Sequence, residues 1–367
     1  MPAVGSGEAG AAPRSAGPRA GRAIVRVGAV AGLASLVALG AGRVPALDLA
    51  SHFRVQYLAG LLPGIALALA LRMRAPALLM ALVALVHAGE VVRAAWPAPS
   101  AHASSVSGEV APGGVTSGEV SGETLTVRVA TVNLLATAAD HGAAIAALRR
   151  LDPDVVVFQE YTPAWHRALS GALDGLPHRH AVPIDGPFGI ALYSRAPIVR
   201  RDAIALDRVA VPTLEALIEI EGARFGILGT HPPPPLGATL LASNARHLRA
   251  LGARAAAIEG PLVVAGDLNA TPWSAAFRAL VEGSGLVDAR RGHGILATWS
   301  PLAGDSLAAR LARSPLTSLP IDHVLVGGGA TVGHAFVGEA AGSDHRAFVA
   351  DVRVPRDPRP PPSRTER

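Results

Sequence analysis

The sequence predicts an α/β domain of two β-sheets with helices outside, preceded by three transmembrane helices. Long apolar runs occupy most of residues 24–92 of the 367-residue chain. Short apolar runs bounded by turn residues recur from residue 124 onward, as is typical of β-strands. Helical patterns lie between some of these runs, and this mixture, with several strands adjacent in sequence, indicates two sheets covered by helices.

The three apolar runs have the length of membrane-spanning helices. They cover residues 24–42, 55–71 and 76–92, and a helix needs roughly 17–25 residues to cross the hydrocarbon core. None of them has the polar face of a soluble amphipathic helix. A cleaved signal peptide is the alternative for the first run, but the other two would still anchor the chain. We therefore expect a three-helix transmembrane region over residues 24–93.

The placement of arginine predicts how these spans are oriented. Arginines cluster around the start of the first span and in the turn between the second and third spans, at Arg14, Arg19, Arg22, Arg26, Arg72 and Arg74. The loop between the first two spans holds Arg43 and Arg54, partly offset by Asp48. The positive-inside rule then places residues 1–23 in the cytoplasm. Three crossings place the chain after Arg93 outside the cytoplasm.

Composition divides the remainder of the chain into a domain and its flanks. Residues 94–123 are rich in Pro, Ser and Gly and predict a flexible linker, while residues 355–367 predict a disordered tail. Residues 124–354 form the predicted globular domain. This domain has 20 Arg against 20 Asp and Glu, so the net charge of +5 comes from the flanks. The balance makes nucleic acid a less favoured partner, and the absence of cysteine excludes disulfides and thiolate metal sites.

The strand and helix patterns follow one another along the domain. The strand-like runs lie at residues 125–135, 154–160, 189–194, 214–220, 224–231, 262–269, 322–328 and 345–354. The helical patterns lie at residues 140–151, 239–258 and 274–283. His178 and His180 fall outside these patterns, and we expect them in a solvated loop.

Polar side chains stand at the ends of six of the predicted strands. In chain order they are Asn133, Glu160, His231, Asp267 with Asn269, Asp322, and Asp344 with His345. A single acid at a strand end is most often a turn or a helix N-cap. A full set is different, because ligand sites assemble where strand ends meet at one edge of a sheet. We therefore expect these side chains to share one pocket.

The motifs that hold these residues resemble a known superfamily. They are TVNLL, VVVFQE, LGTHP, VVAGDLNATP, ATWSP, IDHVLV and GSDHRAFVADV, and they span nearly all of residues 127–352. In this order they are similar to the endonuclease/exonuclease/phosphatase (DNase I-like) superfamily. The resemblance implies a four-layer α/β sandwich and a metal-dependent phosphoric ester hydrolase that uses Mg²⁺, with Mn²⁺ as the alternative. The whole chain, with its three spans, also resembles bacterial membrane proteins associated with teicoplanin resistance.

The resemblance and the chemistry of phosphate ester hydrolysis suggest a role for each side chain. Glu160, Asn133 and Asp344 offer the hard oxygen ligands that Mg²⁺ prefers. Asp267 would orient the attacking water or accept its proton, and Asn269 would hold a phosphoryl oxygen. Both would face one point because alternate residues of an extended segment point the same way.

Two histidines complete the expected catalytic set. Asp322 would hold the His345 imidazole in one tautomer and raise its pKa, as a carboxylate does for a neighbouring histidine. His345 would then stabilise the phosphoryl group or move a proton. His231 would donate a hydrogen bond to a phosphate oxygen.

These expectations lead to a membrane-anchored, extracytoplasmic, metal-dependent phosphoesterase. The anchor favours a phosphate ester or pyrophosphate of a lipid, such as a polyprenyl carrier or a phospholipid, with the lipid bilayer as a second partner. An extracytoplasmic metal-dependent nuclease is the alternative. A sensing protein with an inactive site is a third reading, and the filled polar positions argue against it. No obligate protein partner is inferred.

Overall fold

Strands and helices account for most of the chain in this computed structural model. It describes residues 17–40, 42, 44–97, 124–301, 307–308, 314, 316–340 and 342–356. The predicted linker falls mostly on residues 98–123 and the predicted tail on residues 357–367, which lie outside the described residues. So do residues 1–16, with Arg14, and also Arg43.

The first sheet has six strands and contains both ends of the domain. At its centre, β1 pairs in parallel with β2 and antiparallel with β12. In the parallel pair, Asn133 lies opposite Gln159, the residue before Glu160. The strand order is β11 (Thr331–Val337), β12 (Phe348–Pro355), β1 (Thr124–Asn133), β2 (Val155–Gln159), β4 (Ile190–Ser194) and β3 (His178–Val182).

The second sheet also has six strands and one parallel pair. β7 and β8 are parallel, while β8 and β10 are antiparallel with Asp267 opposite Asp322. The register therefore brings two acidic side chains to the same edge of this sheet. The strand order is β5 (Ile198–Ala205), β6 (Pro212–Ile220), β7 (Ala223–Gly229), β8 (Leu262–Asp267), β10 (Asp322–Gly327) and β9 (Val287–Asp288).

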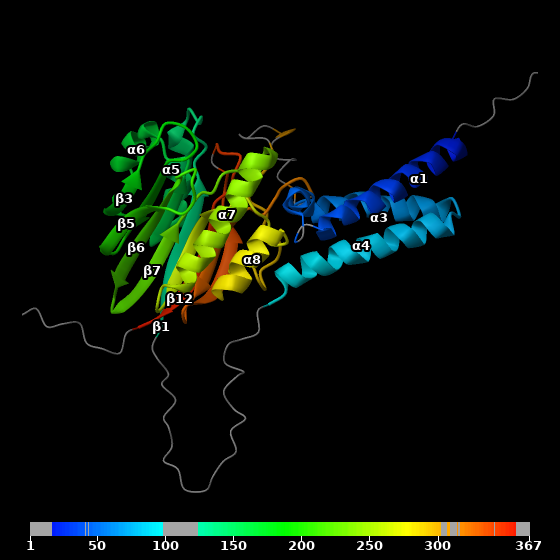
Figure 1. Cartoon of the computed structure of the whole chain (residues 1–367). Helices are drawn as coiled ribbons and strands as arrows, with labels where there is room; N and C mark the ends of the chain where they lie inside the picture. Colours follow the sequence, from blue (N-terminus) through cyan, green and yellow to red (C-terminus); the bar gives the residue numbers. More distant parts are fainter. Residues whose placement is uncertain are drawn as a thin grey trace, which may run out of the picture.

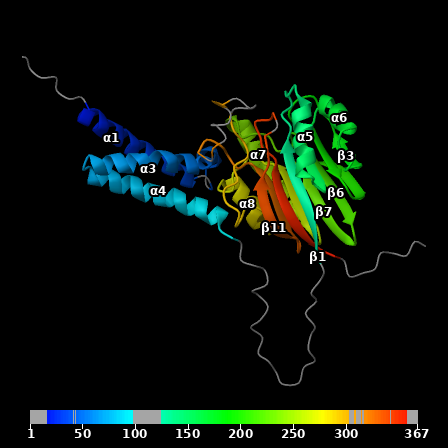
Figure 2. The ribbon, with the colours of Figure 1, turned by 180° about the vertical axis from the view of Figure 1, so that it is seen from behind.

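The two sheets pack against each other through one continuous apolar core. Val129 and Val157 of the first sheet and Ile227 and Val263 of the second belong to it and are at most 1% exposed. Helices cover the outer faces: α5 (His141–Leu151) and α6 (Pro163–Ser170) lie on the first sheet, and α7 (Gly237–Ala256) and α8 (Ala275–Ser284) on the second (Figures 1 and 2). The prediction of two sheets with helices outside is confirmed.

Polar residues fix where three of these helices begin. Asp140 accepts a hydrogen bond from Gly142 N at the start of α5, and Thr162 accepts one from Trp165 N at the start of α6. Ser274 accepts one from Phe277 N at the start of α8. Such caps satisfy N–H groups that have no partner within the helix.

The N-terminal part forms a bundle of apolar helices that projects from the domain (Figure 1). By length and composition, two stretches could cross a membrane, Arg19–Gly40 and Arg74–Ala95. The helix between them has 17 residues and is shorter, so a third span remains a prediction. The elements are α1 (Gly17–Ser35), η1 (Leu36–Gly40), η2 (Pro45–Leu47), α2 (Asp48–Ser51), α3 (Arg54–Ala70) and α4 (Arg74–Ala95).

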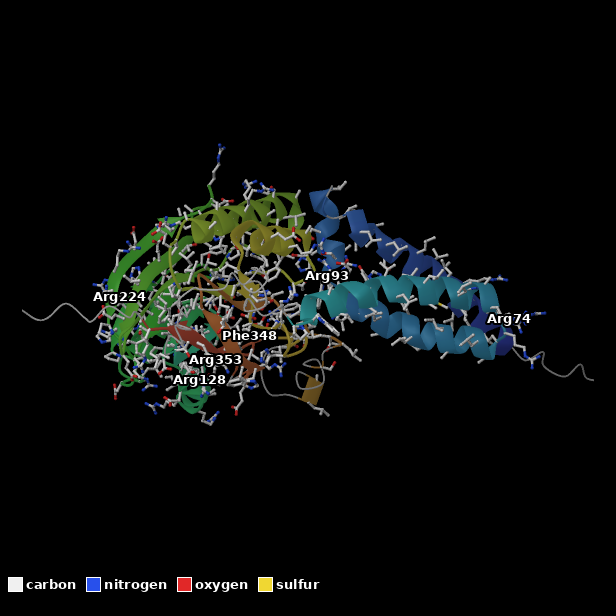
Figure 3. All side chains as sticks on the ribbon, turned by 90° about the horizontal axis from the view of Figure 1, so that it is seen from below. Arg74, Arg93, Arg128, Arg224, Phe348 and Arg353 are labelled. Atoms are coloured by element: carbon white, nitrogen blue, oxygen red, sulfur yellow. The ribbon has the colours of Figure 1, made fainter. Side chains whose placement is uncertain are left out.

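Large apolar side chains on the outside of this bundle are exposed. Val27, Val30 and Leu85 each expose more than 60% of their surface. Arg74 lies at the end of α4 farthest from the domain, and Arg93 lies at the end next to it (Figure 3).

Several elements were not predicted. His178 and His180, expected in a solvated loop, lie in β3, and His180 Nε2 contacts Asp202 O of β5 at 2.9 Å. The strands β3 and β5 each lie at the edge of a sheet and carry charged residues, as edge strands commonly do. Their apolar alternation is therefore too weak to reveal them.

Candidate active site

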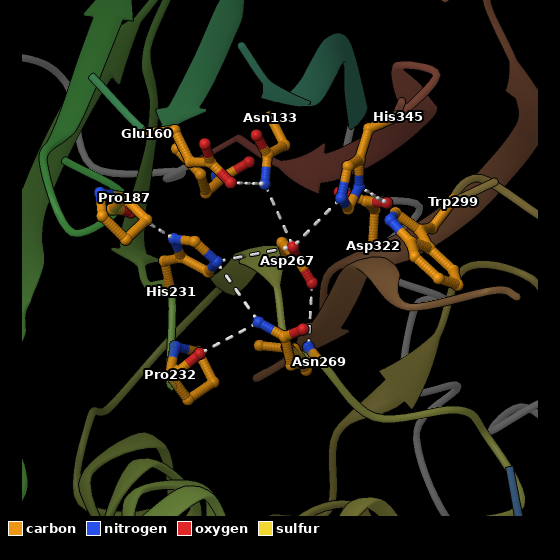
Figure 4. Close-up of polar contacts among 12 residues, drawn as sticks. Asn133, Glu160, Pro187, His231, Pro232, Asp267, Asn269, Trp299, Asp322 and His345 are labelled. Atoms are coloured by element: carbon orange, nitrogen blue, oxygen red, sulfur yellow. Dashed lines mark hydrogen bonds and ion pairs between the residues drawn. The ribbon is translucent and has the colours of Figure 1, made fainter. Parts of the chain in front are cut away.

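Side chains from both sheets meet at one edge of the domain (Figure 4). The first sheet supplies Asn133 at the end of β1, Glu160 just after β2 and His345 before β12; the second supplies His231 after β7, Asp267 at the end of β8 and Asp322 at the start of β10. These six come together because β1 with β2 and β7 with β8 are parallel pairs that end at the same edge.

Asp267 lies at the centre of this group. Its Oδ2 accepts a hydrogen bond from Asn133 Nδ2 at 3.2 Å and lies 3.5 Å from His231 Nε2 and 3.6 Å from His345 Nε2. Burial raises the pKa of Asp267, but His345 and His231 lower it by more, and the pKa is about 2. The carboxylate is therefore a buried anion at neutral pH.

A glycine permits the close approach of β7 and β8 at this point. A Cβ atom on Gly266 would lie 1.9 Å from the carbonyl oxygen of Thr230. Every other residue would push the two chain segments apart. The glycine before Asp267 therefore brings His231, the residue after Thr230, next to the carboxylate.

Asn269 reaches the site by a different route from the one expected. Its φ of +50° is left-handed, so the segment is not extended as predicted. Asp267 Oδ1 accepts a hydrogen bond from Asn269 N at 2.9 Å, which folds the chain into a tight turn. Asn269 Nδ2 then donates to Pro232 O at 3.1 Å and lies 3.3 Å from His231 Nε2. Neither polar residue caps α8, because Ser274 does.

His345 stands between two carboxylates. Its Nδ1 donates to Asp322 Oδ2 at 2.8 Å, and its Nε2 faces Asp267. Burial lowers the pKa of His345, but Asp322 and then Asp267 raise it by more, and the pKa reaches about 10. The imidazole is therefore a cation held in one orientation at neutral pH.

His231 is held in a similar way on the other side of Asp267. Its Nδ1 donates to Pro187 O at 3.0 Å, which leaves Nε2 facing Asp267 and Asn269. Burial lowers the pKa of His231, but the hydrogen bond and charge of Asp267 raise it by more. This places a second hydrogen-bond donor at the site.

Glu160 and Asn133 form the remaining edge of the group. Asn133 Nδ2 donates to Glu160 Oε1 at 3.1 Å, and Ala136 N donates to Glu160 Oε2 at 2.6 Å. Glu160 has a φ of +56°, an uncommon conformation for a residue with a Cβ atom. The backbone turns there and directs the carboxylate toward Asn133.

The donors fit a hard divalent cation. Asp267, Asp322 and His345 offer atoms that all lie within 4.8 Å of one another, but the charge on His345 makes its imidazole a poor ligand. Among the described residues, Asp322 Oδ1 and Asp344 Oδ1 are buried without a hydrogen-bond partner. Asp344 Oδ2 accepts from Trp299 Nε1 at 3.0 Å. Carboxylate oxygens that have no hydrogen-bond partner, such as Asp344 Oδ1, are available as ligands, and Mg²⁺ and Mn²⁺ both prefer oxygen ligands.

A buried network behind the site was missed by the sequence reasoning. Arg290 is 2% exposed and donates to the backbone oxygen of Asp322, to Asp288 Oδ2 at 3.2 Å and to His323 Nδ1 at 2.9 Å. His323 Nε2 in turn contacts Ala270 O at 2.8 Å. The network supports Asp322 and the turn after Asp267. The available signal was the Asp-x-Arg spacing of Asp288 and Arg290 directly after the apolar pair Leu286 and Val287.

The sequence matches one family model over most of the domain. The model described as Endonuclease/Exonuclease/phosphatase family matches residues 130–345, which is more than half of the chain and includes every site residue named above. No curated protein matches the sequence.

Three solved structures from bacteria are similar to this chain, and the first of them supports the fold. The endonuclease/exonuclease/phosphatase from Bacteroides vulgatus is 19% identical with a TM-score of 0.50, and the match covers 63% of this chain and 99% of that one. The endonuclease/exonuclease/phosphatase from Beutenbergia cavernae is 23% identical with a TM-score of 0.48, covering 63% and 72%. Sphingomyelinase C from Streptomyces griseocarneus is 21% identical with a TM-score of 0.47, covering 62% and 99%.

Proposed function

The chain belongs to the endonuclease/exonuclease/phosphatase family, whose members are divalent-metal-dependent phosphoester hydrolases, and on this premise we propose that it hydrolyses a phosphorylated lipid outside the cytoplasm. The bond cleaved is a phosphate ester or a pyrophosphate. The observation that carries the proposal is the position of Asp267, whose buried carboxylate contacts Asn133, His231 and His345 at an edge shared by both sheets.

Glu160, Asn133 and Asp344 would hold the divalent cation. When bound, the cation neutralises charge on the phosphoryl oxygens and on the leaving oxygen. Mg²⁺ is the proposed ion because it needs only one or two carboxylates and keeps several of its waters. Mn²⁺ takes similar oxygen ligands.

The other side chains act on the attacking water and the phosphoryl group. Asp267 is an anion whose Oδ2 faces Asn133, His231 and His345, so it would orient the attacking water or accept its proton. Asn269 and His231 each direct an N–H group toward the same point and hold a phosphoryl oxygen. His345, fixed by Asp322 and positively charged, stabilises the charge that the phosphoryl group carries in the transition state.

The attached helices support a lipid as the substrate. The apolar bundle would confine the site to the membrane surface, and the equal numbers of arginine and acidic residues in 124–354 provide no overall attraction for nucleic acid. The arginines near the first span and in the turn before α4 support an orientation with the N-terminus in the cytoplasm and the domain outside. This arrangement assumes that α3 also spans the bilayer.

A substrate comparison tests the proposal. The full chain, purified in detergent, is incubated with Mg²⁺ or Mn²⁺ and with polyprenyl phosphate, polyprenyl pyrophosphate, phospholipids, duplex DNA and RNA. We expect release of phosphate or of a phosphorylated headgroup from a lipid, with nucleic acids left intact. Hydrolysis confined to DNA or RNA would show that the protein is a nuclease and would overturn the lipid assignment.

A further inference from the structure

The helical bundle and the domain meet at the first turn of α8 (Figure 1). Asp48, at the start of α2, lies between the first two apolar helices and is buried. Its Oδ1 accepts from Ala275 N at 2.7 Å and its Oδ2 accepts from Ala276 N at 3.1 Å. The first N–H groups of a helix have no partner of their own, so a residue 227 positions earlier in the chain completes the cap that Ser274 begins.

Trp273, just before α8, is the second point of attachment. It is 2% exposed, and its indole N–H donates to the carbonyl oxygen of His52 at 3.1 Å. The ring belongs to an apolar cluster with Val55 of α3 and Val91 of α4. A buried tryptophan whose N–H finds a partner contributes both apolar contact area and orientation.

Further contacts surround these two. Arg278 of α8 pairs with Glu90 of α4 at 3.2 Å, and Gln56 Nε2 donates to Ser318 O at 3.2 Å. Beyond α4, Arg291 Nε donates to Trp96 O at 3.0 Å. The interface therefore includes two separate segments of the bundle, the one around α2 and the start of α3 and the one at the end of α4. It consists of several contacts and does not depend on one.

The segment held at this interface is the one that carries Asn269. Only three residues separate Asn269 from Trp273, and the oxygen of the first of them, Ala270, contacts His323 Nε2. The turn is thus fixed by Asp267 at its start, by His323 in its middle and by the helical bundle at its end. Asn269 keeps its left-handed backbone and its contact with His231 inside this frame.

We infer that the helical bundle is a working part of the catalytic site, in which Asp48 and Trp273 are positioning residues for Asn269. The expected effect on kcat rests on the proposed function. A turn freed at its end would let Asn269 move relative to Asp267 and His231. Small displacements of a group that contacts the transition state lower kcat strongly, while ground-state binding of a small substrate changes less.

Kinetics on the full chain in detergent test the positioning role. The probe is bis(p-nitrophenyl) phosphate, a water-soluble phosphodiester, so that access to lipid does not enter the result. Asp48→Ala should lower kcat by roughly tenfold with KM nearly unchanged, and Trp273→Phe, which keeps a ring but loses the N–H, should act in the same direction. Asp48→Asn should lower kcat less than Asp48→Ala, because its single carbonyl oxygen can accept only one of the two N–H groups of Ala275 and Ala276.

Asp140→Ala is the matched control, because Asp140 also caps a helix with its carboxylate, but that helix, α5, lies on the first sheet. It should leave kcat unchanged. Wild-type kcat in Asp48→Ala, or an equal loss in Asp140→Ala, would overturn the inference.

A cleavage assay tests the interface without using activity. A protease site is inserted between Pro97 and Thr124, and the cut protein is passed over a size-exclusion column in detergent. We expect the helical piece and the domain to elute together, and Asp48→Ala combined with Trp273→Phe to separate them. Separation of the wild-type pieces would disprove the interface. Absence of any hydrolysis by the wild type would instead count against the proposed function, and the cleavage result would still stand.

Discussion

His345 and Asp322 form a buried ion pair in which Nδ1 lies 2.8 Å from Oδ2, and the two residues come from opposite sheets. Asp322 begins β10, whereas His345 precedes β12. The pair therefore ties the two layers of the domain together at the place where Asp267 needs a positive neighbour. Removing either partner takes away a close opposite charge from a buried ion, which is costly.

The first prediction concerns Asp267. Asp267→Asn keeps the shape of the side chain but removes the charge and the proton acceptor. General base catalysis contributes typically 10²–10⁴-fold, so kcat should fall by about a thousandfold. The measurement is steady-state hydrolysis by the full chain, with Asp174→Asn, an exposed aspartate, as the matched control. A variant with more than a tenth of wild-type activity would exclude Asp267 from the proton transfer.

The second prediction concerns high pH. The pKa of His345 is raised from 6.5 to about 10, so its contribution to stability is fully present below pH 6.5 and is lost as the pH rises toward 10. Urea unfolding in EDTA should give a midpoint that falls over this range. In His345→Gln the fall should be smaller and the midpoint at pH 6.5 lower. Parallel curves for the two proteins would show that His345 is not charged in the folded state.

The third prediction concerns mildly acidic pH and a histidine away from the site. His247 is buried, its Nε2 contacts Thr230 Oγ1 at 2.7 Å, and burial lowers its pKa from 6.5 to about 4. Its contribution to stability is therefore complete above pH 6.5 and is lost as the pH falls toward 4. The loss amounts to roughly 3 kcal/mol.

The same unfolding experiment checks this prediction. His247→Gln should make the pH dependence between pH 6.5 and 4 shallower, while His52, whose pKa burial also lowers to about 4, still contributes to it. Asp267 and Asp288, whose pKa values are about 2 because nearby positive groups outweigh burial, lose their contribution only below pH 3.8 and do not interfere. An unchanged slope in His247→Gln would contradict the assignment.

The fourth prediction concerns the metal. Chelation with EDTA should abolish hydrolysis, and Mg²⁺ or Mn²⁺ should restore it. Glu160→Gln keeps the size of the side chain but removes its charge, so the Mg²⁺ concentration for half-maximal activity should rise at least tenfold. Calorimetric titration of Mg²⁺ provides a reading that does not depend on turnover. Wild-type Mg²⁺ affinity in Glu160→Gln would move the ligand role to other carboxylates.

The fifth prediction concerns orientation in the membrane, and the natural absence of cysteine makes it simple to test. Asp174→Cys lies on the exposed surface of the domain, and Arg74→Cys lies at the far end of α4. A maleimide that does not cross membranes should label Asp174→Cys in intact cells and label Arg74→Cys only after lysis. The reverse pattern would place the domain in the cytoplasm.

The strand ends and the family could be predicted from the sequence, for physical reasons. Buried strands such as β2 and β8 are continuous apolar runs, and the polar residues that end them stand out against these runs. The family expected from the motifs is confirmed by the match over residues 130–345. The narrower resemblance to teicoplanin-resistance proteins stays a prediction.

Other features could not be predicted from the sequence, one for a local reason and two because they depend on residues far apart in the chain. The turn at Asn269 looked extended, since nothing local shows that Asp267 accepts a hydrogen bond from the backbone two residues later. The support from Arg290 joins β9 to β10, and the cap from Asp48 joins residues 227 positions apart. Separations of this size leave no periodic pattern in the sequence.

The division of the site between the sheets has a consequence for how the enzyme fails. Asn133, Glu160 and His345 belong to one layer, and His231, Asp267 and Asp322 to the other. A small displacement of one sheet relative to the other would move His345 away from Asp267 and Asp322. The hydrogen bonds between the strands of each sheet would stay intact. The rate of turnover therefore depends on how the two sheets are aligned. On heating or with denaturant, activity should be lost before circular dichroism detects any loss of β-structure.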